Sequence, residues 1–419
     1  MRIRIRSILV SAVVLCLSAC GGGNSAGTPA GASTGDSNNS NNANDATNLV
    51  VSGGIARFKN NTAGPDTFIG IEQADQNPDA FPVIASISSI GADRLAINDK
   101  ILVTNNDGAS SPDDRYLKII DLTNFEETGR LNRVSTVLAL NFAPDGILFI
   151  DTAGQGLHRV DFSNLKNPVQ LKWMPTLFTD FESYIRSYKD KNTEKYKILF
   201  QATGVNGLDI WSIETAKDDE AVENTEDDEE LDKPTLLSRL TFKDKNDTKD
   251  ERAVPFQVRS LAIPDQSVLS EEDKKKKTLL ISARAGGVFV LDVTNPAAPF
   301  IRDRYFPKDT EIWDIAVAGR YAYLAAGNQI QVLDIRNLDN IVPVIGLDIP
   351  GFVTRVRVND GYVVFALADA GVLLHRLEDD PGTSYTLIPM PDAETAQDAV
   401  YQSKAVYVAA GNKVLKLSK

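Results

Sequence analysis

A repeat of about 40 residues constrains the fold of this chain more than any other feature of the sequence. Its clearest copy, Ile312–Ile335, reads IWDIAVAGRYAYLAAGNQIQVLDI. The copies align on an apolar segment that often ends in Leu-Asp, with the aligned positions at Asp121, Asp161, Ser212, Asp292, Asp334, Arg376 and Lys416. Their spacings are 40, 51, 80, 42, 42 and 40 residues, and the longest interval contains two charged insertions. One repeated unit therefore accounts for most of the chain.

Each copy contains four short segments that are typical of strands. An alternating segment such as Val353–Val358 comes first, and an apolar segment such as Ala322–Ala326 precedes the aligned one. Asn-Pro or Asn-Leu turns follow, as at Asn295 and Asn337, before a fourth segment such as Val342–Leu347. β-branched and aromatic residues between Gly, Asn, Asp and Pro turns indicate antiparallel strands. Four strands per copy at this period predict the blades of a β-propeller.

The last copy lacks a fourth strand, which would leave an open sheet edge. Two N-terminal segments are candidates to close it: Phe81–Ile87 resembles an orphan fourth strand, and Phe68–Glu72 resembles a third. We therefore expect an all-β propeller of seven four-stranded antiparallel blades, closed by N-terminal strands that pair with the C-terminal blade. The extra segments Ile55–Phe58 and Phe68–Glu72 leave eight blades as an alternative.

The copies resemble the LVIVD repeat family of bacterial propeller lipoproteins. The resemblance rests on Gly319–Ala326 with Val332–Ile335, and on Gly286–Pro296, and it extends over Ile84–Lys419. That family is known chiefly as extracytoplasmic propellers of undefined activity. The resemblance therefore implies a fold and a location, and no reaction.

Residues 1–19 have the features of a signal peptide, with a basic start and the apolar segment Ile8–Leu17. The following LSAC sequence looks like the lipobox of bacterial lipoproteins, in which cleavage leaves an acylated Cys20 as the first residue. Several acyl chains, such as palmitate, suffice for stable membrane anchoring. Gly21 stands where the retention signal of the inner membrane would place Asp, which by resemblance favours the outer membrane, on its periplasmic face or at the cell surface.

The mature chain is expected to have two parts. Residues 20–48 are Gly, Ser, Asn, Ala and Thr with almost no large apolar side chain, which predicts a flexible tether with a reach of roughly 30 Å. Residues 49–419 then form a single propeller domain, with charged insertions at about 216–233 and 266–277.

Charge and cysteine content exclude several classes of function. The formal net charge is −13, and loss of the three signal arginines would leave −16, which disfavours binding to nucleic acids. Of the two cysteines, Cys16 would leave with the signal peptide and Cys20 would be acylated, so the folded domain has neither a free thiol nor a disulfide.

The residues that could bind metals or catalyse reactions form no convincing pattern. The two histidines, His158 and His375, lie in third strands about five blades apart, without carboxylate or cysteine ligands at a suitable spacing. No local Ser-His-Asp arrangement is present, although such triads assemble in space. A weak calcium candidate places oxygen ligands at alternate positions but lacks the Gly and the distal Glu of calcium loops: Asp244, Asn246, Thr248 and Asp250. We expect no other metal and no cofactor.

Recurrent and clustered residues have simple structural interpretations. The aspartates that end the third strands are expected to accept backbone N–H groups of the next turn: Asp121, Asp161, Asp292 and Asp334. Asp218–Asp232 contains ten acidic residues and is expected to be a solvated loop, with a cation or a basic partner as the alternative. Ser270–Lys277, SEEDKKKK, is expected to be an exposed hairpin tip that could pair with that loop. We assign three tryptophans to the core: Trp173, Trp211 and Trp313.

These observations favour a monomeric, non-enzymatic module that is anchored in the cell envelope by lipid and binds a protein or glycan partner. One alternative is a hydrolase-like envelope enzyme with its site in the propeller channel. Another is an outer-membrane assembly scaffold, although the repeat lacks the Trp-containing signature of such propellers. Because a fold does not determine a function, the repeat cannot decide between these alternatives.

Overall fold

The computed structural model describes residues 54–58, 68–70, 75–76 and 81–418, apart from 109–114, 133–135, 144–145, 154–155, 166–167, 175–184, 190–195, 213–234, 245–255, 308, 350, 383–384 and 392–393. The chain divides into two compact units, Met1–Asn42 and Ala43–Lys419, and every described residue belongs to the second unit. The predicted signal peptide, Cys20 and the tether up to residue 48 lie outside the described residues.

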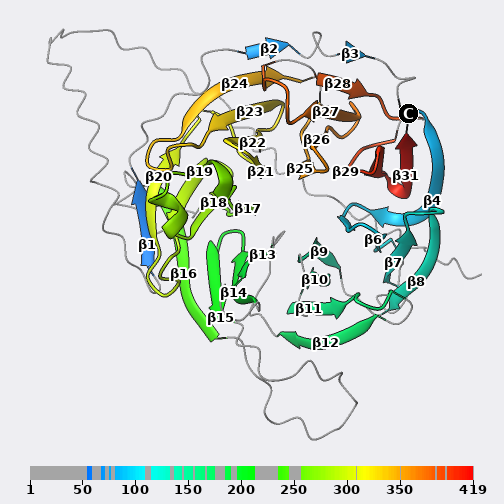
Figure 1. Cartoon of the computed structure of the whole chain (residues 1–419), viewed down its shortest axis with the longest axis horizontal. Coiled ribbons are helices and arrows are strands. Elements are labelled where there is room, and N and C mark those ends of the chain that lie inside the picture. The colour runs from blue at the N-terminus through cyan, green and yellow to red at the C-terminus, as the bar shows by residue number, and fades with distance from the viewer. Residues whose placement is uncertain are drawn as a thin grey trace, which may run out of the picture. The chain divides into compact units, whose positions relative to one another are not determined.

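Seven β-sheets, named blades 1 to 7 here, are arranged radially around a common centre (Figure 1). The strands are given from the innermost outward. Blades 1 and 2 consist of β5 (Leu95–Ile97), β6 (Ile101–Asn106), β7 (Tyr116–Asp121) and β8 (Glu126–Asn132), and of β9 (Val137–Phe142), β10 (Ile147–Thr152), β11 (Gly156–Asp161) and β12 (Val169–Met174). Blades 3 and 4 consist of β13 (Ile185–Lys189), β14 (Tyr196–Ala202), β15 (Leu208–Ser212) and β16 (Thr235–Asp244), and of β17 (Ser260–Ala262), β18 (Thr278–Ser282), β19 (Val288–Asp292) and β20 (Phe300–Tyr305).

Blade 5 consists of β21 (Asp314–Ala318), β22 (Tyr321–Ala325), β23 (Gln329–Asp334) and β24 (Val342–Asp348). Blade 6 consists of β25 (Arg355–Asn359), β26 (Tyr362–Ala366), β27 (Val372–Arg376) and β28 (Tyr385–Ile388). Blade 7 consists of β29 (Asp398–Gln402), β30 (Ala405–Ala409), β31 (Gly411–Ser418) and β4 (Val83–Ala92). The four strands of each blade pair antiparallel. The predicted seven-bladed all-β propeller is therefore confirmed. The described residues contain no α-helix, and no helix among them has the length and hydropathy that a membrane crossing would need.

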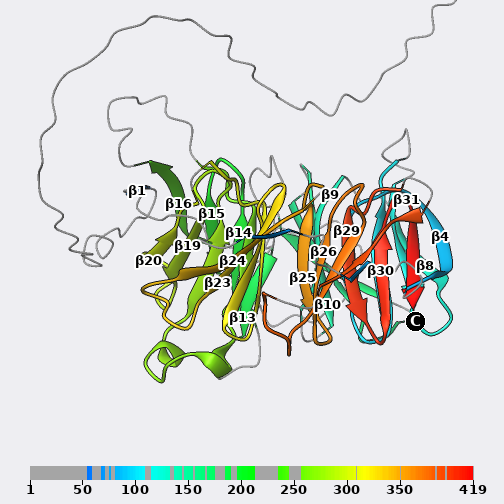
Figure 2. The ribbon, with the colours of Figure 1, turned by 90° about the horizontal axis from the view of Figure 1, so that it is seen from above.

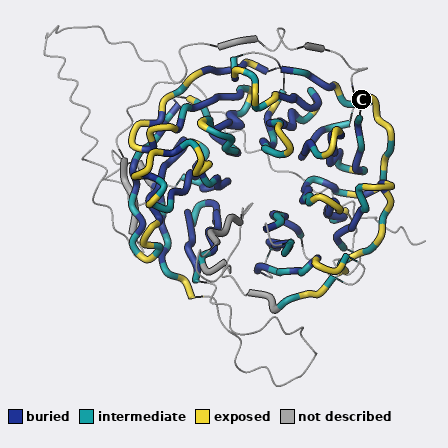
Figure 3. The backbone as a smooth tube through the Cα atoms, in the orientation of Figure 1, coloured by how far each residue is buried: buried dark blue, intermediate teal, exposed yellow. Residues whose placement is uncertain are grey.

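The hydrophobic core is divided among the seven interfaces between neighbouring blades. Seven clusters of buried side chains occur, and each contains residues of two adjacent blades. Phe242 of blade 3 and Phe289 of blade 4 lie with ring centroids 4.8 Å apart, and Tyr323 of blade 5 and Phe365 of blade 6 are 6.3 Å apart. Both faces of a blade are thus buried, as Figure 3 shows for the inner strands. This explains why second and third strands such as β18 (TLLIS) and β19 (VFVLD) are mostly apolar instead of alternating.

The ring is closed by the N-terminal strand β4. It pairs antiparallel with β31 and is the outermost strand of blade 7, in a register that places Ser86 opposite Leu415. Only Asp93 and Arg94 separate β4 from β5, the innermost strand of blade 1. The prediction that Phe81–Ile87 supplies a missing fourth strand is confirmed, and the open edge of the last copy is covered.

Three shorter N-terminal strands add to other blades, and here one expectation was wrong. Phe68–Glu72 was predicted to form a third strand, but β2 (Phe68–Gly70) pairs parallel with β24 as a fifth strand of blade 5. Likewise, β1 (Gly54–Phe58) pairs with β16 and β3 (Asp75–Gln76) pairs with β28. Outermost strands expose unpaired N–H and C=O groups that accept an added strand. These segments therefore extend existing blades and do not build an eighth.

The aspartates that end the third strands act as predicted. The carboxylates of Asp121, Asp161, Asp292 and Asp334 each accept the backbone N–H two residues later, at 2.7, 2.7, 2.8 and 3.0 Å. Such bonds stabilise the turn into the fourth strand. The recurrence of Asp in the repeat therefore has a structural cause.

The lysine-rich insertion forms two short 3-10 turns, η5 (Gln266–Val268) and η6 (Asp273–Lys275), between β17 and β18. They project beyond one face of the ring, next to β20 in Figure 2. The segment contains its own ion pairs: Glu271 and Lys274 lie 2.6 Å apart, and Asp273 pairs with Arg302 of β20 at 2.6 Å. It is an exposed tip as predicted, whereas the acidic segment Asp218–Asp232 lies outside the described residues.

Candidate binding site

Charged residues alternate at one position in four consecutive blades. The position is the start of the innermost strand. It is occupied by Asp314 in blade 5, Arg355 in blade 6 and Asp398 in blade 7. In blade 1 the equivalent residue is Arg94, directly before β5. All four residues are buried, with exposed fractions of 9% or less. Because the innermost strands all run in one direction, these side chains form an arc at one end of the channel, which we call the mouth.

Asp398 joins three consecutive blades. Its carboxylate accepts the backbone N–H of Leu95 in blade 1 at 2.9 Å, and it accepts two hydrogen bonds from the Arg357 guanidinium in blade 6 at 2.6 and 2.5 Å. Arg357 also donates to the Leu95 carbonyl oxygen at 2.8 Å. Such a bidentate pair fixes both the position and the orientation of the guanidinium.

Asp314 has the same role between blades 5 and 6. Its carboxylate accepts the N–H of Ile315 at 2.8 Å and that of Val356 at 3.0 Å, and it forms a hydrogen bond with the side chain of Ser260. Burial raises the pKa of Asp314 to about 6, although these hydrogen bonds and the nearby Arg357 oppose the shift. The carboxylates of the arc therefore hold neighbouring inner strands together.

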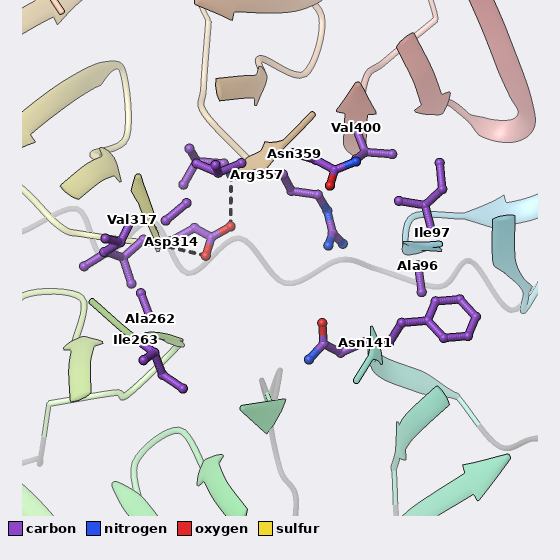
Figure 4. A pocket seen from close by; sticks show the side chains of 15 residues that line it. Ala96, Ile97, Asn141, Ala262, Ile263, Asp314, Val317, Arg357, Asn359 and Val400 are labelled. Atoms are coloured by element: carbon purple, nitrogen blue, oxygen red, sulfur yellow. Dashed lines mark hydrogen bonds between the residues drawn. The ribbon is translucent and has the colours of Figure 1, made fainter. Parts of the chain in front are cut away.

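The channel contains a cavity of about 360 Å³ behind this mouth. Innermost strands of six blades line it, and its polar groups come from Asp314, Arg357, Asn359 and Asn141. Figure 4 shows the guanidinium of Arg357 and the side-chain amide of Asn141 directed into the open space from opposite walls. Small-molecule sites in proteins have cavities of this size with a few convergent polar groups.

Aromatic and arginine side chains cluster at the mouth beside blades 4 and 5. The Trp313 ring has the guanidinium of Arg284 at 4.2 Å and that of Arg259 at 5.1 Å. Phe352 meets Trp313 edge-on at 5.2 Å and is 38% exposed. Arg284 is held by Glu311 at 2.6 Å and by the Gln257 side chain at 2.8 Å. We call these side chains the mouth cluster.

Arg284 occupies a position where the fold favours glycine. In blades 3, 4 and 6, one residue of the turn between the second and third strands forms an isolated β-bridge with the next blade. These residues are Gly204, Arg284 and Ala368, with φ of 59°, 42° and 49°. A left-handed conformation strains any residue with a Cβ. Blade 4 thus has a strained residue at this place, and the side chain of that residue lies over the Trp313 ring. Strained residues concentrate at functional sites.

The two histidines lie away from this cavity. His375 is fully buried in β27, stacked on Tyr385 with ring centroids 4.6 Å apart. His158 in β11 is half-buried, and burial lowers its pKa. Both are third-strand residues as predicted. The described residues contain no group of three or more His, Cys, Asp or Glu that could hold a metal ion.

Some predicted sites cannot be located. Asp244 ends β16, but Asn246, Thr248 and Asp250 lie outside the described residues, as does the lipidation site Cys20. Trp211 is buried, in agreement with its assignment to the core. Trp313 is only half-buried and belongs to the mouth cluster, so its assignment to the core was incomplete.

Sequence reasoning missed Arg357, Asn359, Asn141 and Arg284. The signal for Arg357 was visible, because it lies in an alternating strand where the equivalent residues of other copies are Ala96, Ala262, Ala316 and Val400. A charged residue at a repeated apolar position marks a departure from the repeat. Arg284 was hidden, because only the backbone shows that its place in the turn is left-handed.

Comparison with known proteins supports the fold. Residues 311–342 match the model of the LVIVD repeat. This segment includes Trp313, Asp314 and the whole of β21 to β23. No curated protein matches the sequence.

The chain is also similar to solved structures. The crystal structure of the Cps50 (Swd1) β-propeller domain of Myceliophteria thermophila is similar with a TM-score of 0.54 and 11% identity, and the match covers 81% of this chain and 99% of that domain. The computationally designed Ika8 protein has a TM-score of 0.48 and 14% identity, with 80% and 98% covered. At 11% identity, the likeness to the Cps50 (Swd1) domain shows the fold alone.

Proposed function

We propose that this protein is a non-enzymatic binding module of the bacterial cell envelope that holds a protein partner at the mouth of its propeller. A β-propeller repeat fold is consistent with a binding or scaffold module. The observation that carries the proposal is the mouth cluster, where two arginines and an exposed phenylalanine surround Trp313.

The composition of the cluster supports a protein interface. Trp, Arg and aromatic residues are enriched in the centres of protein interfaces, where they supply most of the binding energy. Phe352 exposes 38% of its surface although it packs against Trp313. The Arg284 side chain keeps 27% of its surface exposed and Phe352 keeps 38%, so the cluster offers a partner segment with acidic and apolar side chains a guanidinium and an aromatic ring.

The backbone at Arg284 allows a substitution that removes the guanidinium without disturbing the turn. A glycine at this place, as at Gly204 in blade 3, would relieve the left-handed strain, which costs about 1–2 kcal/mol. The guanidinium of Arg284 lies over Trp313 and is held by Glu311, which positions it to contact a partner. Substitution Arg284→Gly should then weaken binding while it leaves the folded ring intact.

Partner capture from envelope extracts tests the proposal. The full chain, Phe352→Ser and Arg284→Gly should be compared, with Tyr321→Ala as control. Tyr321 is an aromatic residue of blade 5 at the opposite end of the inner strands, and it is half-buried like Trp313. We expect one reproducible partner, lost from both mouth variants and retained by the control. Equal capture by all four proteins would remove the mouth cluster from the proposal.

The envelope location rests on the sequence. The signal-like residues 1–19, the lipobox ending at Cys20 and the following tether support lipid anchoring, and Gly21 supports the outer membrane. Labelling with a radioactive fatty acid should mark the full chain, and Cys20→Ser should abolish the label and release the protein from the membrane fraction. Unchanged membrane association of Cys20→Ser would contradict the anchor.

A further inference from the structure

The channel cavity and the mouth cluster have different chemistry, and the cavity carries a separate inference. The mouth cluster is aromatic and partly exposed. The cavity lies behind it, is enclosed by the innermost strands of six blades, and measures about 360 Å³. That volume is at the lower end of the range of about 300–1,000 Å³ for small-molecule sites.

Two polar side chains of blade 6 present unused hydrogen-bonding atoms to this space. Arg357 uses Nε and one terminal nitrogen for Asp398 and Leu95, and its second terminal nitrogen has no partner among the described residues. Asn359 donates from its amide nitrogen to the Tyr401 carbonyl at 2.8 Å and to the Gln402 side chain. Its amide oxygen accepts no hydrogen bond from the described part of the chain. One donor and one acceptor therefore lie two residues apart on the same wall.

The donor is held rigidly in place. Asp398 is fully buried, is fixed by the Leu95 N–H, and binds the Arg357 guanidinium through both oxygens. The Arg357 side chain retains 23% exposure, which leaves it accessible from the channel. A group already held in its binding orientation loses little entropy when a ligand arrives.

The charges at the site favour a neutral ligand. The positive charge of Arg357 is offset by the bidentate contact with Asp398, and the carboxylate of Asp314 also faces the cavity. An anion would gain little from a guanidinium already paired and would approach Asp314. Hydroxyl groups, in contrast, can accept from Arg357 and donate to the Asn359 oxygen at the same time.

The remaining walls are apolar. Ile97, Phe142, Ile263, Val317 and Val358 line the cavity between the polar groups. A ring that has hydroxyl groups on its edge and C–H groups on its faces matches this distribution. We therefore propose that the channel cavity binds a neutral saccharide, with Arg357, Asn359 and Asn141 as its hydrogen-bonding residues.

Isothermal titration of the full chain, in a detergent without a sugar headgroup, tests the proposal. The probes are glucose, galactose and N-acetylglucosamine, with inorganic phosphate and acetate as anionic probes. We expect saturable single-site binding of at least one sugar, with Kd below about 10 mM, and no binding of either anion. Absence of binding for all three sugars, or tighter binding of an anion, overturns the proposal.

A matched pair of variants locates the site. Ala316→Leu would add three carbon atoms at the wall of the cavity, whereas Ala318→Leu adds the same bulk two residues along β21, beside a second cavity between blades 5 and 6. Both alanines are half-buried and pack against the same hydrophobic cluster. We expect Ala316→Leu to weaken sugar binding by tenfold or more and Ala318→Leu to leave it unchanged, where tenfold corresponds to about 1.4 kcal/mol.

Equal affinities of the two variants would refute the channel as the site. If Ala316→Leu proves unfolded by circular dichroism, Asn141→Ala takes its place, because Asn141 lies on the opposite wall and its loss should also weaken binding about tenfold. Partner capture at the mouth uses different variants, so failure of the saccharide proposal leaves the proposed function unaffected, and the reverse also holds.

Discussion

Removal of the Asp398 carboxylate should destabilise the ring more than removal of any exposed acidic side chain. In Asp398→Ala, the buried N–H of Leu95 loses its acceptor and the Arg357 guanidinium loses its charged partner. Removal of one member of a buried ion pair costs about 3–5 kcal/mol. The loss should lie near the lower value, because Arg357 is 23% exposed and water from the channel can solvate it.

The free energy of unfolding, measured by urea denaturation with circular dichroism, checks this value. Glu378→Ala is the matched control, because Glu378 also pairs with an arginine, Arg376, but both side chains are exposed, and such pairs contribute at most about 1 kcal/mol. A double variant, Arg357→Met with Asp398→Leu, should recover part of the loss, since it leaves no unpaired charge. The reasoning fails if Asp398→Ala costs no more than the control, or if the double variant is the sum of its single variants.

Three further predictions concern the backbone, the pH dependence and the closure of the ring. In urea denaturation, Gly287→Ala should lower the free energy of unfolding by several kcal/mol more than Gly319→Ala. Both glycines have positive φ, but a Cβ at Gly287 would lie 2.1 Å from the Tyr305 carbonyl oxygen, while a Cβ at Gly319 would have nothing within 4 Å. Equal losses of unfolding free energy would contradict the close approach at Gly287. Because burial raises the pKa of Asp314 from 3.8 to about 6, the folded state binds the proton more tightly, so this group's contribution to stability should be greatest below about pH 4 and fall by about 3 kcal/mol as pH rises to 6. In urea denaturation from pH 4 to 8, the unfolding free energy of the natural chain should fall by that amount relative to Asp314→Asn, and parallel profiles would refute it. A chain without residues 81–92 should lose cooperative thermal unfolding, and a synthetic peptide of that sequence should restore it by pairing with β31; no effect of the peptide would argue against closure by β4.

The sequence predicted those parts of the fold that depend on local pattern. Four strands per copy, the aspartate turns and the closing strand at Phe81–Ile87 all follow from residues close together in the chain or from a gap in the repeat. The partners of β1, β2 and β3 could not be predicted. Each is short and pairs with a strand far away in the sequence, so no local pattern identifies which exposed edge it joins.

The site was less predictable than the fold for a related reason. The direction of the Arg357 side chain depends on the register of β25 and on Asp398, a residue of the next blade. The role of Trp313 depends on Arg284, which reaches it from another blade through a left-handed turn. Each contact joins two copies of the repeat, whereas the sequence describes each copy separately.

The order in which the N-terminal strands meet the ring has a mechanical consequence. Force applied at the N-terminal end of the described chain would reach β1 first, then β2 and β3, and only then β4. The first three strands contain five, three and two residues, while β4 contains ten and lies between β31 and the start of blade 1. The shorter strands would therefore detach in sequence and absorb extension before the load reached the strand that closes the propeller. A protein tethered at this end would yield in small steps while its ring stayed shut.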